Sequence, residues 1–574
     1  MQTPDSLQKV RGYILAHARN QGWYHGLDRA VVSARMKTMT DDYVITATMV
    51  SCAAGLAGIV VSFYIYLLFH GSLAAIPLII LIPFLLYYAS FTFITAYPGM
   101  IAMERGKIID EKMPAFASHM AIMLQNNAYL LDAFKYIEKS NLYGEIGEEI
   151  GIILNRASFN INFVDAINYV AATTSSYELR KFLNGIVETT TNIGTLDTYL
   201  RNASENLSRL SLIKNRDNAQ SRASLVEIYT IAMVMMPLMI LLTQMTTALM
   251  GQEIAIGGIM VYGYIPLGTL VFILIEERSV KMKVDEKKGA NDKKKGKEKH
   301  AVGLKEKVHM HEYLRTEDGL IVIGIFIALP VFYILYLSNF GIDTVLLVFS
   351  AIAVLPYAVY WHIELNRIKK EEEVMPVFLR NVSDRNKMGF GIIEIFEPSP
   401  VYENITKRVD KIYHSLKMGE NLETAIEVLK DKRSFIMTRA TVIINDALRA
   451  GGNINKVLES VAEDIQNQFN TYREVEGDMK RNTKMIMATY FLFIGIVWII
   501  NNMFFKSLAG MTSSAHSPLP IDIVYYKQLF YHGSALAGIS AGLVMGKYEK
   551  GDPRPGLVFS AVFALITVVA FKYI

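Results

Sequence analysis

Long apolar stretches constrain the fold of this chain most strongly, because each is long enough to cross a lipid bilayer as a helix. A hydrocarbon core of about 30 Å is spanned by roughly 20 residues at the rise of an α-helix. We count nine such stretches, at about 43–69, 73–97, 225–249, 253–275, 319–340, 343–361, 485–505, 526–546 and 556–571. With 52% hydrophobic residues in 574, the chain is predicted to be an all-α integral membrane protein.

Two hydrophilic segments separate these spans, at 98–224 and 362–484. Apolar residues recur there every three or four positions, as at Phe116, Met120 and Met123, which predicts helical bundles. The predicted order is an amphipathic segment (1–42), a membrane hairpin (43–97), a first block (98–224), a hairpin (225–275), a Lys-rich linker (276–318), a hairpin (319–361), a second block (362–484) and three final spans (485–574).

The two blocks are copies of one another. Glu111-Lys-Met-Pro-Ala-Phe116 in the first block matches Glu373-Val-Met-Pro-Val-Phe378 in the second, at an offset of 262 residues. Matches continue downstream while the offset falls to 258, as expected of an internal duplication with small loop changes. The positions that we expect to be structural in both copies are Pro114, Phe116 and Gly194, matched by Pro376, Phe378 and Gly452.

Positive charge is confined to one set of the connections between spans. Residues 1–42, both blocks, the linker and residues 547–554 carry it, whereas the other connections contain little beyond Lys506. Lys and Arg accumulate on the cytoplasmic side of membrane proteins. We therefore predict a multi-pass protein of the cell membrane with a cytoplasmic N-terminus, two cytoplasmic blocks and a C-terminus outside. The N-terminal segment is expected to contact membrane lipid.

No set of residues indicates an enzyme. Gly542-Leu-Val-Met-Gly546-Lys547 lacks the spacing and the Ser or Thr of a phosphate-binding loop. His309, His311 and Glu312 could bind a metal, but a solvated linker offers no second shell. The single cysteine, Cys52, excludes an intramolecular disulfide. We predict no catalysis, cofactor or metal, and a net charge of +4 does not favour nucleic acid as a partner.

Charged residues within membrane spans usually mark a route for ions or protons. Here the acidic residues near the spans, Glu227, Glu253 and Asp343, lie at span ends. Both blocks are also predicted on the same side, so the two halves run parallel rather than inverted. A transporter with regulatory cytoplasmic domains therefore stays open as an alternative, but its main sequence signature, a charged residue within a span, is not found.

Small residues form a stripe along the eighth span. Ser534, Gly538, Gly542 and Gly546 recur every four positions, which lets another helix approach closely. The stripe predicts either packing within the monomer, or a dimer contact or groove that admits a foreign transmembrane helix.

The repeated motifs resemble a known domain. Pro-x-Phe at the start of each block, Tyr143-Gly-Glu near the middle of the first, and Gly451-Gly-Asn-Ile-Asn-Lys-Val-Leu458 near the end of the second are similar to the type II secretion F domain. The duplicated layout with nine spans resembles the archaellum platform family and its archaeal pilus relatives. A membrane receptor or scaffold without a filament partner stays open as a further alternative.

This resemblance implies a non-enzymatic platform for a type IV pilus-like filament, either an archaellum or an adhesive pilus. It implies a separate cytoplasmic hexameric ATPase as one partner and filament subunits, archaellin or pilin, bound through membrane helices as another. Filament geometry favours a homodimer.

Basic residues near the start of each block are our candidates for the ATPase contact. Exposed basic side chains steer association with an acidic partner. The candidates are Arg105, Lys107, Lys112, Lys369, Lys370, Arg380, Arg385 and Lys387.

The first block departs from the family pattern at its turns. Asn127 and Tyr129 stand where the second block has Gly389 and Gly391. Ile193 likewise stands where the second block has Gly451. We therefore expect the turns of the first block to differ from the family pattern.

Overall fold

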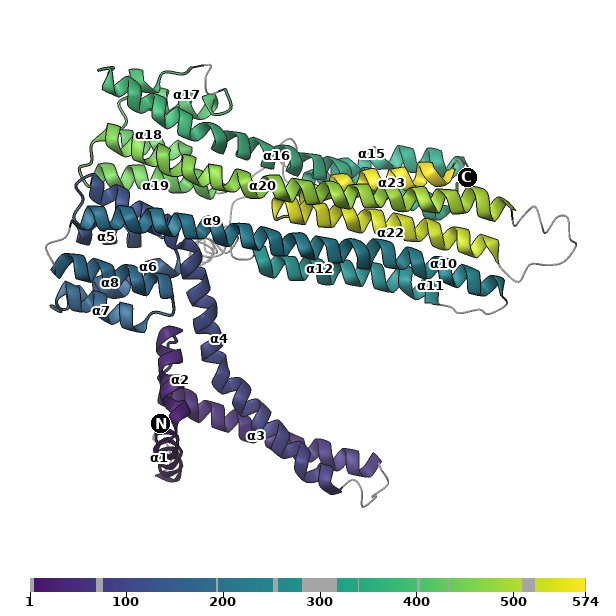
Figure 1. Cartoon of the computed structure of the whole chain (residues 1–574), viewed down its shortest axis with the longest axis horizontal. Coiled ribbons are helices and arrows are strands. Elements are labelled where there is room, and N and C mark those ends of the chain that lie inside the picture. Colours follow the sequence, from purple (N-terminus) through teal and green to yellow (C-terminus); the bar gives the residue numbers. More distant parts are fainter. Residues whose placement is uncertain are drawn as a thin grey trace, which may run out of the picture. The chain divides into compact units, whose positions relative to one another are not determined.

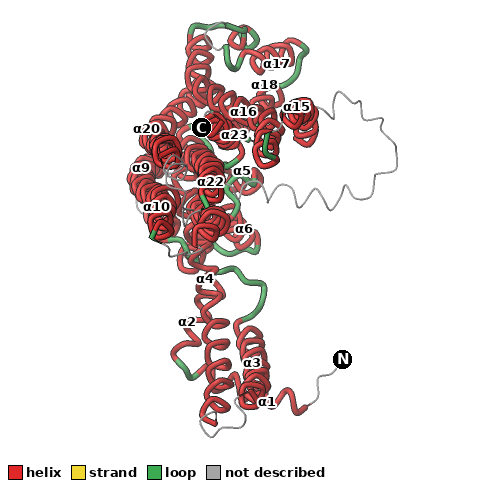
Figure 2. Tube along the Cα trace, turned by 90° about the vertical axis from the view of Figure 1, so that its right-hand side faces the viewer, coloured by secondary structure: helices red, strands yellow, loops and turns green. Residues whose placement is uncertain are grey.

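The computed structural model describes residues 5–68, 76–191, 195–250, 256–280, 317–338, 340–399, 403–431, 433–507 and 522–572. Over these residues the chain is helical, and Figure 2 shows no strand. Gly194, most of the Lys-rich linker with His309, His311 and Glu312, and the loop at 508–521 lie outside the described residues.

Nine helices in the described part are long and apolar enough to cross a membrane, which confirms the predicted number. They are Thr40–Tyr64, Leu81–Gln125, Leu196–Ala248, Ile256–Glu276, Gly319–Leu337, Ile342–Lys387, Glu476–Phe505, Ile523–Lys550 and Arg554–Phe571. Some are much longer than the predicted spans, because the same helix continues from the apolar segment into a hydrophilic block.

The chain forms two compact units. The first comprises Met1–Arg209 with Asp446–Asn453, and the second Leu210–Asn445 with Ile454–Ile574. The first unit contains α1 (Asp5–Arg19), α2 (Gly22–Ser33), α3 (Thr40–Leu68), α4 (Ile76–Gln125), α5 (Leu130–Ser140), α6 (Glu145–Ser158), α7 (Phe163–Thr173), α8 (Tyr177–Thr191) and the start of α9 (Leu196–Tyr229).

In the first unit, α3 and α4 lie side by side as a hairpin, and α4 continues into the block formed with α5 to α8 (Figure 1). The core of this block is the apolar face of α4 together with the inward faces of the shorter helices. Met113, Phe116 and Met120 of α4 are fully buried, as are Ile146 and Ile150 of α6. These spacings of three and four residues are those of one helix face.

The second unit is a bundle of long helices that run side by side (Figure 1). Its elements are the rest of α9, η2 (Thr230–Met235), α10 (Met236–Leu249), α11 (Ile256–Ile259), η3 (Met260–Tyr264), α12 (Ile265–Val280), α15 (Glu317–Leu337), α16 (Ile342–Lys387), α20 (Ile454–Ile499), η8 (Ile500–Phe505), α22 (Ile523–Lys550), η9 (Arg554–Gly556) and α23 (Leu557–Lys572). α22 is the most enclosed span, with 72% of its apolar window buried.

The second block also belongs mainly to this unit. It consists of the end of α16, η5 (Glu394–Phe396), α17 (Thr406–Lys417), α18 (Leu422–Ile426), η7 (Glu427–Leu429), α19 (Phe435–Arg449) and the start of α20. Phe378, Phe396 and Val409 are buried in its core.

Two prolines inside the spans follow widened turns. η2 and η3 are π-helical, and Pro237 and Pro266 are the second residues after them. A proline ring collides with the carbonyl group four residues earlier, here that of Met233 or Tyr262. Because these residues lie in the π turns, each helix accommodates its proline by a local change in helix register.

The helix boundaries of the two blocks repeat at the offsets predicted from the sequence. α4 and α16 end 262 residues apart, at Gln125 and Lys387. α8 and α19 begin 258 residues apart, at Tyr177 and Phe435. The equivalence therefore extends from short motifs to whole elements.

The turn that ends the long helix has the same conformation in both blocks, although asparagine stands in one and glycine in the other. Asn127 (φ 69°) and Gly389 (φ 88°) are both left-handed. The N–H of Ala128 donates to the carbonyl of Met123, as that of Phe390 donates to Arg385. Asparagine tolerates the left-handed region better than most residues, so it replaces glycine in the same Schellman turn.

Candidate functional site: ion clusters in the blocks and a polar belt below the spans

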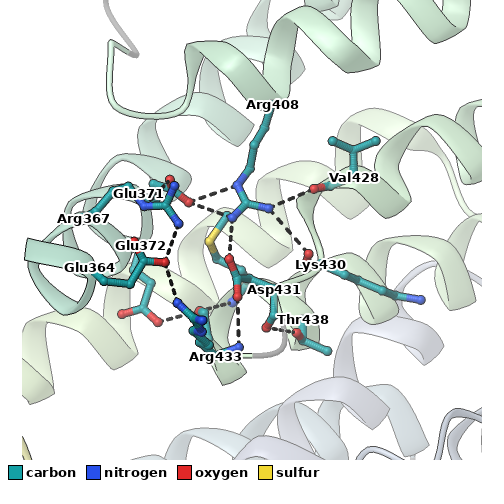
Figure 3. A network of polar contacts seen from close by, with 12 residues as sticks. Glu364, Arg367, Glu371, Glu372, Arg408, Val428, Lys430, Asp431, Arg433 and Thr438 are labelled. Carbon is teal, nitrogen blue, oxygen red and sulfur yellow. Dashed lines mark hydrogen bonds and ion pairs between the residues drawn. The ribbon is translucent and has the colours of Figure 1, made fainter. Parts of the chain in front are cut away.

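A buried ion cluster holds the second block together around Arg408 of α17 (Figure 3). Its guanidinium donates to Glu371 of α16, with Nε 3.0 Å from Oε2, and lies 2.5 Å from Oδ2 of Asp431. The same side chain donates to the carbonyl groups of Val428 at 3.1 Å and Lys430 at 3.5 Å. Arg408 thereby joins the long helix α16, α17 and the loop before α19.

Asp431 remains ionised in this cluster. Burial alone would raise the pKa of its carboxyl, but the N–H of Arg433 and the guanidinium of Arg408 both donate to it, and the net effect lowers the pKa. Next to it, Ser434 donates to Glu372 of α16 at 2.5 Å and accepts from the N–H of Met437 at 3.0 Å. The start of α19 is therefore capped and attached to α16 by one residue.

The first block has a corresponding cluster around Glu149 of α6, which is fully buried. Arg35, which follows α2, donates to it through Nε at 3.1 Å and through Nη2 at 2.5 Å. Nη2 of Arg105 of α4 lies 3.2 Å from Oε1 of the same carboxylate. Ser176 donates to Asp110 of α4 and caps α8, as Ser434 does for α19.

Arg105 is not an exposed residue, contrary to the expectation from sequence. It is 8% exposed and pairs with Glu145, Glu148 and Glu149 of α6. Burial raises the pKa of Glu145, and the attraction of Arg105 only partly offsets this. The packing of α6 on this face of α4 cannot be read from the sequence, so Arg105 is indistinguishable there from an exposed ATPase candidate.

The other ATPase candidates fall into two groups. Lys107, Lys370 and Arg380 are exposed, and no ion pair involves them within the described part of the chain. The remaining four are engaged or half-buried: Lys112 lies near Gly144, Lys369 pairs with Glu476, Arg385 donates to the carbonyl groups of Glu394 and Glu397, and Lys387 pairs with Glu459 at 2.8 Å.

The expected structural positions lie in the block cores. Phe116 and Phe378 are fully buried, and each packs against another aromatic ring, Phe182 and Phe396 respectively. Pro114 and Pro376 lie within the long helices α4 and α16. Gly452 donates its N–H to the carbonyl of Ala447, which closes the turn after α19.

At the ends of the spans nearest the second block, polar side chains from several helices of the second unit form what we call the polar belt. Its first part centres on Arg222 of α9, which pairs with the buried Glu276 of α12 and donates to the carbonyl of Tyr548 of α22 at 3.1 Å. The phenol of Tyr548 in turn accepts from Asn482 of α20 at 2.9 Å. Glu276 has no local signal in the sequence, because it lies one residue beyond the apolar stretch at 253–275.

The second part of the polar belt connects α16, α20 and α22. Lys369 and Lys480 both pair with Glu476 of α20. Lys550 of α22 donates to Asn366 of α16 at 3.0 Å. Arg554 lies over the ring of Trp361 of α16, 4.1 Å from its centre. Polar side chains thus connect α16, α20 and α22 where these helices leave the spans.

The small-residue stripe of α22 is covered within the chain. A Cβ added to Gly542 would lie 2.2 Å from the backbone nitrogen of Ser560 of α23, and one on Gly546 would lie 2.3 Å from that of Gly556. Ser534 and Gly538 are also buried, and Gly538 approaches Tyr490 of α20. The stripe therefore packs against α20 and α23 within the chain.

No group of three side chains suited to a metal ion occurs among the residues that the structure describes. Most of the buried charges named above lie between helices as ion pairs.

Comparison with known proteins places these features in a family context. The model of the family described as "Type II secretion system (T2SS), protein F" matches two segments, residues 116–243 and 392–501. An uncharacterized protein of Methanocaldococcus jannaschii, MJ1286, is 21% identical over 501 residues, which cover 83% of this chain and 82% of that protein. No solved structure matches. The chain thus has two segments that resemble this domain, arranged as an internal duplication.

Proposed function

We propose that this multi-pass membrane protein is the platform of a type IV pilus-like archaeal filament, the archaellum, and that a separate cytoplasmic hexameric ATPase drives it. One observation carries the proposal: each block that resembles the T2SS F domain shares unbroken helices with membrane spans. The blocks are the part that the ATPase grips, and the spans are the part that acts on the filament base. The chain itself is not an enzyme in this proposal.

The ion clusters and the polar belt supply the mechanical connection. α16 runs from the spans into the second block, where Arg408 and Ser434 attach α17 and α19 to it. α20 leaves the block and enters the spans without a break until η8. A rotation or lift of the block is therefore passed to α16 and α20 together, and the polar belt distributes it to α9, α12 and α22.

Filament subunits, archaellin or pilin, meet the platform through their hydrophobic helices in this proposal. Because α23 covers the stripe of α22, we place this contact on spans with exposed apolar surface. α15 has only 11% of its apolar window buried, and Phe326, Tyr333 and Leu337 lie on its exposed side. The homodimer, too, is assigned to surfaces other than the stripe.

In this proposal, the N-terminus and both blocks of the protein lie in the cytoplasm and the C-terminus lies outside. It rests on the distribution of Lys and Arg between the connections. An adhesive pilus platform is the alternative within the same class. The genes that flank this one separate the two, since an archaellum platform is expected beside archaellin genes and an ATPase gene.

The ATPase contact is testable with the two exposed residues of α16. Lys370→Glu with Arg380→Glu should abolish co-purification of the ATPase and filament assembly, while the protein remains inserted in the membrane. The control is Lys506→Glu, a single charge reversal at an exposed lysine that follows η8, at the opposite end of the span from the second block. Retention of the ATPase by the double variant would rule out this contact surface.

A further inference from the structure

Lysine side chains from α16, α20 and α22 meet in the second part of the polar belt. Lys369 and Lys480 share one carboxylate, that of Glu476. The partners of Lys550 within the described residues are neutral: Oδ1 of Asn366 at 3.0 Å and Nδ1 of His362 at 3.3 Å.

The charges of this lysine cluster (Lys369, Lys480 and Lys550) do not cancel. Lys369 and Lys480 lie near enough to Lys550 to repel its ammonium group, while Glu476 and the neighbouring Glu549 attract it. The two ammonium groups and two carboxylates that act on Lys550 balance one another, so the charge of Lys550 itself is in excess there; Glu372, which attracts Lys369, is not among the groups that act on Lys550. One turn earlier on α22, Lys547 is only 7% exposed, and no ion pair reaches it within the described part of the chain. It adds a second excess charge beside the cluster.

Apolar side chains adjoin the cluster on the side of the spans. Ile363 of α16 is 61% exposed and Met485 of α20 is 36% exposed. The excess charge thus lies where a helix passes from apolar to polar surroundings, which is the level of lipid headgroups. An anion that carries apolar chains matches both features: its charge meets the lysines, and its chains lie along α16 and α20.

We propose that the lysine cluster binds the phosphate of an anionic phospholipid headgroup, with Lys550 as the central donor. The chemistry recognised is that of a phosphate group, and the bilayer is its source. A bound lipid would complete the polar belt, because its phosphate bridges α16, α20 and α22 as an ion pair would. This proposal is independent of the filament partner and of the orientation of the chain.

The test uses the full-length protein in zwitterionic detergent. Phosphatidylglycerol, phosphatidylcholine or inorganic phosphate is added, and the unfolding midpoint and the lipid retained in native mass spectrometry are measured. Phosphatidylglycerol should raise the midpoint and be retained, while phosphatidylcholine should not. Since one lysine near the surface is worth about 1 kcal/mol, Lys550→Gln should weaken phosphatidylglycerol binding about five-fold.

Two further variants separate the site from general effects of charge. Lys550→Arg keeps the charge and should bind as wild type does. Lys411→Gln removes an exposed lysine of α17, away from the spans, and should have no effect. Unchanged helical circular dichroism in phosphatidylcholine establishes that Lys550→Gln is folded. If inorganic phosphate alone raises the unfolding midpoint, the result supports the phosphate site but shows that its ligand comes from solution. Equal binding of the two lipids, or identical behaviour of Lys550→Gln and Lys411→Gln, would overturn the proposal.

Discussion

Glu149 and Arg408 stand at equivalent positions of the two blocks, 259 residues apart, and carry opposite charges at the centre of corresponding clusters. Glu149 is held by Arg105 of the long helix and by Arg35, whereas Arg408 is held by Glu371 of the long helix and by Asp431. The duplicated fold has thus kept an ion cluster at this place although the charge of its central residue is reversed. What the packing requires there is a matched set of charges.

The clusters predict that loss of either central residue is costly. Glu149→Gln removes the fully buried carboxylate that Arg35 and Arg105 share, and only the more exposed Glu145 and Glu148 still pair with Arg105. Arg408→Met removes the nearest cation from Glu371 and Asp431. Removing one partner of a buried ion pair costs about 3–5 kcal/mol. Both variants should therefore lower the thermal unfolding midpoint of the purified protein clearly. Arg201→Met serves as control, because it breaks an exposed pair with Glu205 and should change the midpoint little.

Asp431 predicts an acid-sensitive second block. Its pKa in the folded protein is lower than its ordinary value of 3.8, so the folded state favours the charged form. The resulting stabilisation is present above the ordinary value and is lost as the pH falls through the lowered one. Asp431→Asn should remove this contribution. Unfolding midpoints of wild type and variant should differ at neutral pH and converge below about pH 4; a constant difference at every pH would contradict this account.

Close packing of α22 on α23 predicts that a single methyl group at Gly542 is destabilising. Its Cβ would approach the backbone of Ser560, which cannot move aside as a flexible side chain could. Overpacking of this kind costs about 1–3 kcal/mol, so Gly542→Ala should lower the unfolding midpoint in detergent. Gly495→Ala, within the span of α20, is the matched control because its Cβ would meet open space. Equal midpoints for the two variants would show that α23 does not cover this face.

The polar belt predicts a variant that binds the ATPase but does not assemble filaments. Glu276→Gln removes the charge partner of Arg222 and so weakens the connection between α9 and α12. We expect the protein to be inserted and to retain the ATPase, while filaments visible by electron microscopy are lost. Glu205→Gln, an exposed carboxylate of α9, should assemble filaments normally. Normal assembly by Glu276→Gln would exclude a coupling role for this pair.

The proposed orientation predicts the accessibility of two exposed positions to a membrane-impermeant thiol reagent. In a Cys52→Ser background, Met418→Cys in the turn after α17 should react only after the membrane is permeabilised. Val524→Cys at the start of α22 should react in intact cells. The reverse pattern would place both blocks outside.

Several features of the fold and of the site could be predicted from the sequence, and others could not. Buried positions such as Phe116 and Phe378 were identifiable because a motif repeated at a fixed offset. The basic residue Arg105 has no local signal that separates it from Lys107, although one is buried and the other exposed. Glu276 gave no signal either, because its partner Arg222 lies 54 residues earlier in the chain.

The sequence by itself determined that the described part of the chain contains nine helices of sufficient length and hydropathy, and that the hydrophilic blocks are duplicated. These properties depend on residue type and on spacing within a segment, which apolar length and periodicity record directly. Only the tertiary structure decided which charges are buried in pairs, that α23 rather than a partner covers the stripe of α22, and that lysines of three helices gather at one place. Such outcomes depend on helices far apart in the chain meeting in space, and no local pattern contains that information.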